Sequence, residues 1–243
     1  MCFHTSTIER VNAIEQQTQT KLANESYRNQ FDQPQYHLNG FTHPAMLIIT
    51  QERNDLLIPA YWGIVPPHEK PDQLDKYYKK AVKFGGGLNA RDEKLFNHFI
   101  YKHSILSKKC LIPVSGFFEP HTHNKTKYPF YIKNAKGQLL MLGGIYTRID
   151  DQVTFSIITK KASPLFEEIH NIKNRQPLIL ERSQWTKWLS LNDPAAVENL
   201  INIKFDDDLL ETYPVKKALF SPKEDSNVSS IIERTDYPEL VKN

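Results

Sequence analysis

The stretch that does most to decide the fold is Cys110-Leu-Ile-Pro-Val-Ser-Gly-Phe-Phe-Glu119, an apolar run that ends in one carboxylate. Short runs of apolar, β-branched and aromatic residues between turn residues are typical of buried strands. We therefore expect a strand over 110–118. Similar runs extend this prediction to a whole sheet: Ala45–Thr50, Leu56–Ile64, Tyr128–Ile132, Leu139–Tyr146 and Val153–Thr159.

Helical patterns lie mostly outside this series of strands. Residues 8–30 are polar, with apolar positions at Ile8, Val11, Ile14 and Leu22, which predicts an amphipathic helix on the surface. Four more helices are expected: Asp92–His103, Pro164–His170, Ser183–Ser190 with Ser183 as its cap, and Pro194–Ile201. Because strands and helices do not alternate regularly, the order indicates an α+β fold rather than βαβ units.

The composition is that of an ordinary soluble protein. The chain has 243 residues, of which 40% are hydrophobic and 24% charged, with a formal net charge of +3. No repeat or shift in composition divides it, so we expect one compact domain over residues 1–232 and a loose tail over 233–243. The weak positive charge does not by itself indicate a nucleic-acid partner, but it agrees with a local basic groove.

The two cysteines and the N-terminus indicate a cytoplasmic protein. Cys2 and Cys110 are too few for a disulfide framework, although a bond between them is not ruled out by the sequence. The N-terminus lacks an apolar signal core, and no segment approaches the roughly 20 apolar residues of a membrane helix. We therefore expect no membrane contact.

Cys2 carries the strongest chemical signal. Removal of Met1 would leave a cysteine at the N-terminus, with an α-amine and a thiol on neighbouring carbons. An α-amine has a pKa of roughly 8, against about 10.4 for lysine, so it can attack an aldehyde near neutral pH. The thiol can then close the imine into a thiazolidine. The alternative is an ordinary cysteine at a frayed terminus.

Four further segments place polar groups where an enzyme needs them, and each also has an ordinary structural interpretation. Gly85–Glu93 offers Asn89 and Arg91 as donors, or Asn89 as a helix cap. Glu119 among aromatic residues would have a raised pKa and act as a general acid and base, or it is a surface residue at a strand end. The other two segments are Ser163–Leu180, which contains His170, and Tyr61–Pro67, whose aromatic side chains could form core or stack on a base.

Taken in order with Cys2, these segments resemble the SRAP family, the SOS-response-associated peptidase or abasic-site processing proteins. The resemblance covers most of the chain, and the order and spacing of six short motifs carry it. They are Met1-Cys2, Trp62–Pro66, Asn89–Glu93, Cys110–Glu119, Lys127–Ile132 and His170–Pro177. We accordingly expect a mostly antiparallel, barrel-like curved sheet flanked by helices.

The resemblance implies a DNA-damage protein that binds single-stranded DNA and crosslinks to an abasic site through the N-terminal Cys2. Glu119 and His170 would open the closed deoxyribose by relaying a proton. Asn89 would orient the amine or the sugar oxygens. A weak strand-nicking lyase activity through the same imine is an expected side reaction, and the family's peptidase label leaves open whether the protein removes Met1 itself.

The expected DNA contacts follow from the same resemblance. Arg91 would hold a flanking phosphate, and Lys83, Lys173 and Arg175 are further candidates for backbone contacts. The remaining candidates are His4, as a partial replacement for a family arginine, and Trp62, as a structural part of the site wall. We expect no metal ion and no organic cofactor, and we expect a monomer because one aldehyde needs one aminothiol.

The chain departs from the family pattern at several positions. Phe3 and His4 follow Cys2 where many members have Gly and Arg, and His68 stands where a second tryptophan is frequent. Pro120 and Gln176 also replace family residues. The three residues 172–174 form an insertion if His170 is aligned with the family histidine; without the insertion, Lys173 would take that position.

Two other functions remain open from the sequence. A cysteine peptidase could use Cys2 with His170 and Asn89, although it gives no reason for a nucleophile at the N-terminus. A non-covalent single-stranded DNA-binding protein would explain the basic and aromatic residues but not Glu119 and His170. A metal site at His121 and His123 is disfavoured, because a lone His-x-His has too few ligands.

Overall fold

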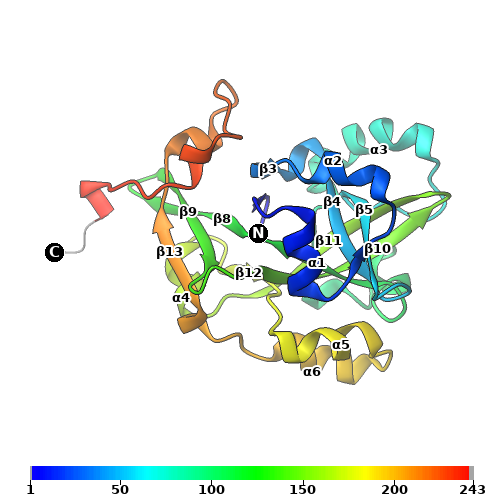
Figure 1. Cartoon of the computed structure of the whole chain (residues 1–243). Helices are drawn as coiled ribbons and strands as arrows, with labels where there is room; N and C mark the ends of the chain where they lie inside the picture. The colour runs from blue at the N-terminus through cyan, green and yellow to red at the C-terminus, as the bar shows by residue number, and fades with distance from the viewer. Residues whose placement is uncertain (1, 241–243) are drawn as a thin grey trace.

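Two curved sheets form the framework of the protein in a computed structural model that describes residues 2–240 (Figure 1). The larger sheet has eight strands, in the order β12-β11-β10-β7-β4-β5-β2, and β6 pairs with β11 beside this path. Its strands are β2 (Lys21–Leu22), β4 (Ala45–Thr50), β5 (Leu56–Trp62), β6 (Asn89–Arg91), β7 (Lys109–Val114), β10 (Leu140–Ile149), β11 (Gln152–Lys161) and β12 (Arg175–Pro177).

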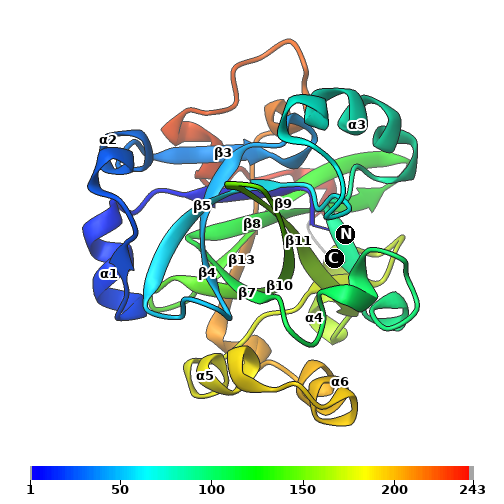
Figure 2. The same ribbon diagram turned by 90° about the vertical axis from the view of Figure 1, so that its right-hand side faces the viewer.

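Five strands of this sheet close into a barrel. β11 pairs antiparallel with β10 and parallel with β5, where Thr154 lies opposite Tyr61, so the path β11-β10-β7-β4-β5 returns to its start. Figure 2 shows these strands curving around one another. Closure removes most free edges and encloses an apolar interior that includes Ile48, Ile112 and Phe155.

The smaller sheet is entirely antiparallel and has the order β13-β9-β8-β1-β3. Its strands are β1 (His4–Thr7), β3 (Gln35–Asn39), β8 (Gly116–His123), β9 (Thr126–Asn134) and β13 (Leu210–Pro214). In Figure 1 it lies beside the barrel, and β1 brings the N-terminal residues to the region between them.

In the described part of the chain, six α-helices surround the sheets: α1 (Val11–Thr18), α2 (Arg28–Phe31), α3 (Leu74–Ala81), α4 (Pro164–Ile169), α5 (Arg182–Ser190) and α6 (Pro194–Asn202). The α5 helix packs on the barrel through buried Trp188, whose Nε1 donates to the carbonyl of Cys110 at 3.0 Å. The predicted α+β fold, one compact domain with a mostly antiparallel, barrel-like sheet flanked by helices, is confirmed.

The single strand predicted over 110–118 is instead two strands, because the chain passes from β7 in the barrel to β8 in the smaller sheet at Ser115. The Ser115 hydroxyl accepts a hydrogen bond from the Ile8 amide at 2.7 Å, which ties the crossing point to the end of β1. Gly116 follows, and a Cβ there would lie 2.6 Å from the Ile132 carbonyl oxygen. Only glycine fits at this close approach of two backbones.

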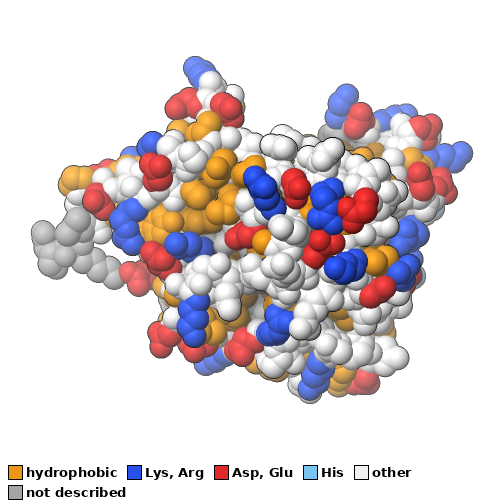
Figure 3. Space-filling model, viewed as in Figure 1, with side chains coloured by type: hydrophobic (Ala, Val, Ile, Leu, Met, Phe, Trp, Pro, Cys, Tyr) orange, Lys and Arg blue, Asp and Glu red, His pale blue; other side chains and the backbone are white. Residues whose placement is uncertain are grey.

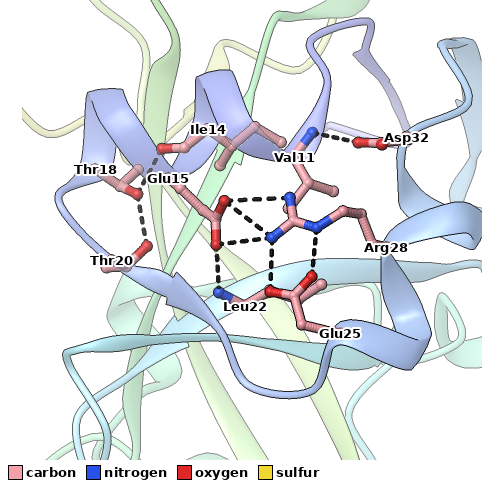
Figure 4. A network of polar contacts seen from close by, with 9 residues as sticks. All are labelled: Val11, Ile14, Glu15, Thr18, Thr20, Leu22, Glu25, Arg28 and Asp32. Carbon is pink, nitrogen blue, oxygen red and sulfur yellow. Dashed lines mark hydrogen bonds and ion pairs between the residues drawn. The ribbon is translucent and has the colours of Figure 1, made fainter.

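The helix predicted over 8–30 is also wrong in its extent. α1 ends at Thr18, its C-cap Gln19 adopts a left-handed φ of 59°, and β2 then pairs with β5 before α2 begins. Figure 4 shows the polar network that holds this broken segment together. Glu15 accepts from the Leu22 amide at 2.8 Å and from the Arg28 guanidinium at 3.2 Å, so one carboxylate joins α1, β2 and α2.

Two more helix predictions need correction, and one helix was not predicted. The expected helix Asp92–His103 contains only two 3-10 turns, Asp92–Lys94 and Tyr101–His103. The cap of α5 is Glu181, whose side chain forms a capping box with Gln184, and not Ser183. The α3 helix was not predicted, although Leu74, Tyr77, Tyr78 and Ala81 have the spacing of one helix face.

Both cysteines are buried and free, and they lie in the same apolar cluster. Among residues 2–240, no helix has the length and apolar character needed to cross a membrane. Near the C-terminus, Tyr237 donates a hydrogen bond to the Val215 carbonyl at 3.0 Å and packs edge-on against Tyr128. The division of the chain at residue 232 stays a prediction.

Candidate functional site

Cys2 lies just before strand β1, which pairs with β8, the strand that contains Glu119. His4 lies opposite Phe118 in the antiparallel pair β1–β8, so the residues before His4 run alongside Glu119. Cys2 is fully buried, and its Sγ lies 3.8 Å from the His4 carbonyl, which accepts a weak hydrogen bond from the thiol. Burial raises the pKa of the Cys2 thiol well above its ordinary value, and the charge of Glu119 raises it further. The thiol is therefore neutral at physiological pH.

Glu119 and His170 form a buried pair beside Cys2. The His170 Nδ1 lies 3.2 Å from the Glu119 Oε2, and the two side chains are 5% and 0% exposed. Burial raises the pKa of Glu119 to about 7 and lowers the pKa of His170 to about 4, because a buried site disfavours both charged forms. Glu119 can therefore gain and lose a proton near neutral pH, as a general acid and base requires.

The tautomer of His170 follows from its second contact. The His170 Nδ1 lies 3.1 Å from the carbonyl of Arg175. A carbonyl oxygen only accepts, so Nδ1 carries the hydrogen and Nε2 is the acceptor nitrogen of the neutral ring.

A pair of hydrogen bonds fixes the turn that holds His170. The Asn171 side chain donates to the Thr122 carbonyl at 2.9 Å and accepts from the Thr122 amide at 3.0 Å, which docks the end of α4 on β8. Residues 172–174 form a turn that closes where the Asn174 amide donates to the His170 carbonyl at 3.0 Å. The structure thus places His170, and not the exposed Lys173, beside Glu119.

Asn89 contacts Cys2 from the barrel side. β6 pairs in parallel with β11, and from this short strand the Asn89 Nδ2 donates to the Cys2 carbonyl at 2.8 Å. The Asn89 Oδ1 is buried and has no hydrogen-bond partner among residues 2–240. An acceptor without a partner is costly in a buried position, so this oxygen is suited to an incoming donor such as an amine or a sugar hydroxyl.

A groove of about 1160 Å³ leads away from Phe3 and Asn89. One wall is α3 with the following glycine-rich loop, and the other is the coil of 3-10 turns that begins at residue 92; Figure 2 shows both on one side of the molecule. Five basic side chains line the groove: Lys76, Lys80, Lys83, Arg91 and Lys94. The acidic Glu69 also lines it. On the face drawn in Figure 3, basic and acidic side chains are interspersed.

The other residues predicted to bind DNA lie in different settings. The Arg175 guanidinium is 14% exposed and contacts Asp92 at 2.8 Å and Glu93 at 3.0 Å, so it faces carboxylates within the protein. The His4 Nδ1 lies 2.8 Å from the Nε2 of His37, and burial lowers the pKa of His4 to about 3, which leaves it uncharged. Neither side chain presents a free positive charge to a ligand.

Trp62 belongs to the apolar core and is not among the residues that line the groove. It is fully buried, donates from Nε1 to the Leu88 carbonyl at 2.9 Å, and stacks on Phe155. Lys83 and Arg91 are exposed at the groove, where Arg91 lies 3.7 Å from Glu93.

Sequence reasoning missed most of the groove. The basic residues Lys76, Lys80 and Lys94 were not singled out, nor were the aromatic residues Phe84 and Phe99. The spacing of Lys76 and Lys80, four residues apart, was the available signal, because such residues share one face of a helix. Between residues 2 and 240, no group of three or more His, Cys, Asp and Glu side chains could hold a metal ion.

Comparisons with known proteins identify the family of the chain. A family model described as SOS response associated peptidase (SRAP) matches residues 1–222. The abasic site processing protein YoqW of Bacillus subtilis is 30% identical over 214 residues, which cover 81% of this chain and 90% of that protein. The abasic site processing protein YMR114C of Saccharomyces cerevisiae is 29% identical over 190 residues, which cover 70% of this chain and 49% of that protein.

A crystal structure of a protein from Bacteroides thetaiotaomicron has the same fold. It matches with a TM-score of 0.80 and 29% sequence identity, and the match covers 96% of this chain and 100% of the other. The chain belongs to the SRAP family, and its fold is that of the Bacteroides protein.

Proposed function

We propose that the protein captures abasic sites in single-stranded DNA, through a covalent thiazolidine on Cys2 once Met1 has been removed. The observation that carries this proposal is the contact of Asn89 with the Cys2 carbonyl next to the buried pair of Glu119 and His170. The names of the relatives as abasic site processing proteins support the same substrate class. Met1 itself lies outside the described residues.

The chemistry starts with opening of the deoxyribose ring. The Glu119 carboxyl, whose pKa is raised to about 7, donates a proton to the ring oxygen while a base removes the proton of the anomeric hydroxyl. The imidazole of His170 and the ionised form of Glu119 are the two groups that can accept that proton. The product is the open aldehyde at C1′.

Capture then takes two balanced steps. The α-amine of Cys2 adds to C1′, and water leaves to give an imine. The Cys2 sulfur next bonds to C1′, the C=N double bond becomes single, and the thiol proton passes to nitrogen. A neutral thiol suits this order, because the amine must attack first and the thiol closes the ring afterwards.

The raised pKa of the Cys2 thiol argues against the peptidase alternative. A cysteine peptidase needs a thiolate, which a neighbouring histidine or other positive charge stabilises. Burial has the opposite effect here. The imine that precedes ring closure can lose the 3′ phosphate by β-elimination, so weak strand nicking belongs to the same proposal.

The groove supplies the contact with the DNA strand. Lys76, Lys80, Lys83, Arg91 and Lys94 can pair with successive phosphates on the way to Cys2. One lesion reacts with one aminothiol, so a monomer is sufficient. In a cell this reaction would shield an abasic site during the response to DNA damage.

Denaturing gels test the proposal with an oligonucleotide that carries one abasic site. The wild-type protein should give a shifted band, and Cys2→Ala should give one only when borohydride traps its imine. Cys110→Ala, which removes the other buried cysteine, should crosslink like the wild type. An undamaged strand should give no band, and intact mass should confirm the loss of Met1. The proposal is refuted if the wild-type protein lacks Met1 and still gives no stable band.

A further inference from the structure

Two phenylalanines in the groove are far more exposed than apolar side chains normally are. Phe84 is 82% exposed and Phe99 is 61% exposed, and both line the groove that leads to Asn89. Large apolar side chains in such positions add little to the stability of a fold. Because both line one groove, they mark a binding surface, which we call the aromatic clamp (Phe84 and Phe99).

The surroundings of Phe84 fit a strand of nucleic acid. Phe84 is the last residue of the 3-10 turn Val82–Phe84 that follows α3, and Gly85 comes next with a left-handed φ of 88°. The Lys83 Nζ lies 5.1 Å from the centre of the Phe84 ring. An apolar ring and a positive charge therefore stand side by side, as a base and its phosphate would require.

Phe99 is linked to the candidate active site by a short chain of contacts. The ring of His98 lies 4.7 Å from that of Phe99 and stacks at 4.0 Å on Tyr101. The Tyr101 hydroxyl donates to the Asn89 carbonyl at 3.3 Å. The far wall of the groove is thus tied to the same residue that contacts Cys2.

We infer that Phe84 and Phe99 stack on intact bases next to the abasic site, so that the preferred substrate is a lone lesion and not a run of base-free sugars. This inference rests on the proposed function and adds the requirement that the nucleotides next to the lesion carry bases. An abasic nucleotide has no ring to offer, and lysines recognise phosphates that every strand carries. The clamp can only be filled by a base from a flanking nucleotide.

The test compares three oligonucleotides with one abasic site each. In one, all flanking bases are intact; in the others, three nucleotides on the 5′ or on the 3′ side are replaced by tetrahydrofuran residues. These analogues keep the phosphates but carry neither base nor aldehyde. At protein concentrations below saturation, loss of the bases on the side that lies in the groove should slow crosslinking about 5- to 100-fold, the range expected for stacking of one base.

Variants assign this effect to the clamp. Phe84→Ala with Phe99→Ala should slow capture of the lone lesion by a similar factor, and removal of flanking bases should then have little further effect. Phe84→Trp with Phe99→Trp should retain the preference. Tyr27→Ala is the matched control, because Tyr27 is 39% exposed and does not line this groove.

Equilibrium binding separates the inference from the proposed function. Fluorescence anisotropy with the same strands, each carrying tetrahydrofuran at the lesion, needs no chemistry and should show the same 5- to 100-fold dependence on flanking bases. The inference is overturned if wild-type protein binds strands with and without flanking bases equally, or if the double alanine variant keeps the full dependence. Base-dependent binding without any crosslink would instead refute the capture chemistry and leave the clamp intact.

Discussion

The Nδ1 of His170 lies 3.2 Å from the Oε2 of Glu119, although the two residues belong to different elements and are more than forty positions apart. The Glu119 carboxyl is on β8, in the smaller sheet, and His170 follows α4. Both are buried, and burial brings the pKa of Glu119 to about 7. This pair is the part of the site whose chemistry the structure defines most closely.

The first prediction concerns the acid and base role of Glu119. Glu119→Gln keeps the shape of the side chain but cannot exchange a proton, so crosslinking should slow about 100-fold or more. The crosslinking rate of the wild type should rise with pH as more of the α-amine becomes unprotonated. Above about pH 7 it should fall, because Glu119 ionises and no longer donates a proton. In single-turnover crosslinking from pH 5 to 9, the variant should lack the second effect.

The matched control is Glu167→Gln, which changes an exposed carboxylate on α4. It should crosslink at the wild-type rate. An unchanged rate in Glu119→Gln would show that ring opening does not depend on this carboxyl.

The second prediction concerns stability. The folded pKa of Glu119 is about 7, above the ordinary carboxyl value, so the folded state binds this proton more tightly than the unfolded chain. The free energy of unfolding should therefore fall as the pH rises from about 4.5, the ordinary carboxyl pKa, to about 7. Relative to wild type, Glu119→Gln should gain about 2 to 3 kcal/mol between pH 5 and pH 8. Denaturant unfolding at the two pH values measures this, and equal changes in both proteins would contradict it.

The third prediction concerns Asn89. Asn89→Ala removes the donor to the Cys2 carbonyl and the buried acceptor beside it, so crosslinking should slow about 10-fold, as expected for loss of one orienting hydrogen bond. Asn97→Ala changes an exposed asparagine of the following segment and should have no effect. Crosslinking time courses at saturating protein compare the two variants. Equal rates in both would remove Asn89 from the site.

The fourth prediction concerns the groove. Lys80→Ala should weaken binding of any single strand and should reduce the slope of log affinity against log salt by about 0.7, the value for one phosphate contact. Lys136→Ala, an exposed lysine outside the groove, is the control. Anisotropy titrations over a range of salt concentrations give both slopes. Identical slopes for the two variants would place the DNA elsewhere.

The fifth prediction concerns the crossing between the two sheets. A Cβ at Gly116 would lie 2.6 Å from the Ile132 carbonyl oxygen and from the ring of Tyr131. Gly116→Ala should therefore destabilise the fold by about 1 to 3 kcal/mol or more, since backbone and ring must move. Gly137→Ala has open space and only its left-handed φ of 70° to oppose it, so its cost should be smaller. Thermal unfolding compares the two variants, and Gly116→Ala should lower the Tm more than Gly137→Ala does.

The sequence predicted the long buried strands, because each is an apolar run. It did not predict the shorter and more polar strands β1, β2, β3, β6, β12 and β13. The division at Ser115 could not be predicted, because it depends on which sheet each half joins. The expected helix over Asp92–His103 failed for a similar reason. Asp92 and Glu93 contact Arg175, which is far away in sequence, so the local pattern of residues 92–103 does not reveal this contact.

The site was less accessible to sequence reasoning than the fold. The structure places Cys2, Asn89, Glu119 and His170 in one region, whereas their catalytic roles stay predictions. A basic residue in the sequence does not always present a positive charge at the surface. Arg175 is paired with carboxylates, and burial keeps His4 neutral. The lysines of α3 were missed because their helix was.

Intact mass of the adduct tests the central claim most directly. After reaction with an oligonucleotide that carries one abasic site, the account predicts a single product whose mass is that of the chain without Met1 plus the DNA minus one water. This product should persist in denaturant without a reducing agent and be absent for Cys2→Ala. A product that retains Met1, or one that forms without the Cys2 thiol and survives denaturant, would contradict capture by the N-terminal aminothiol.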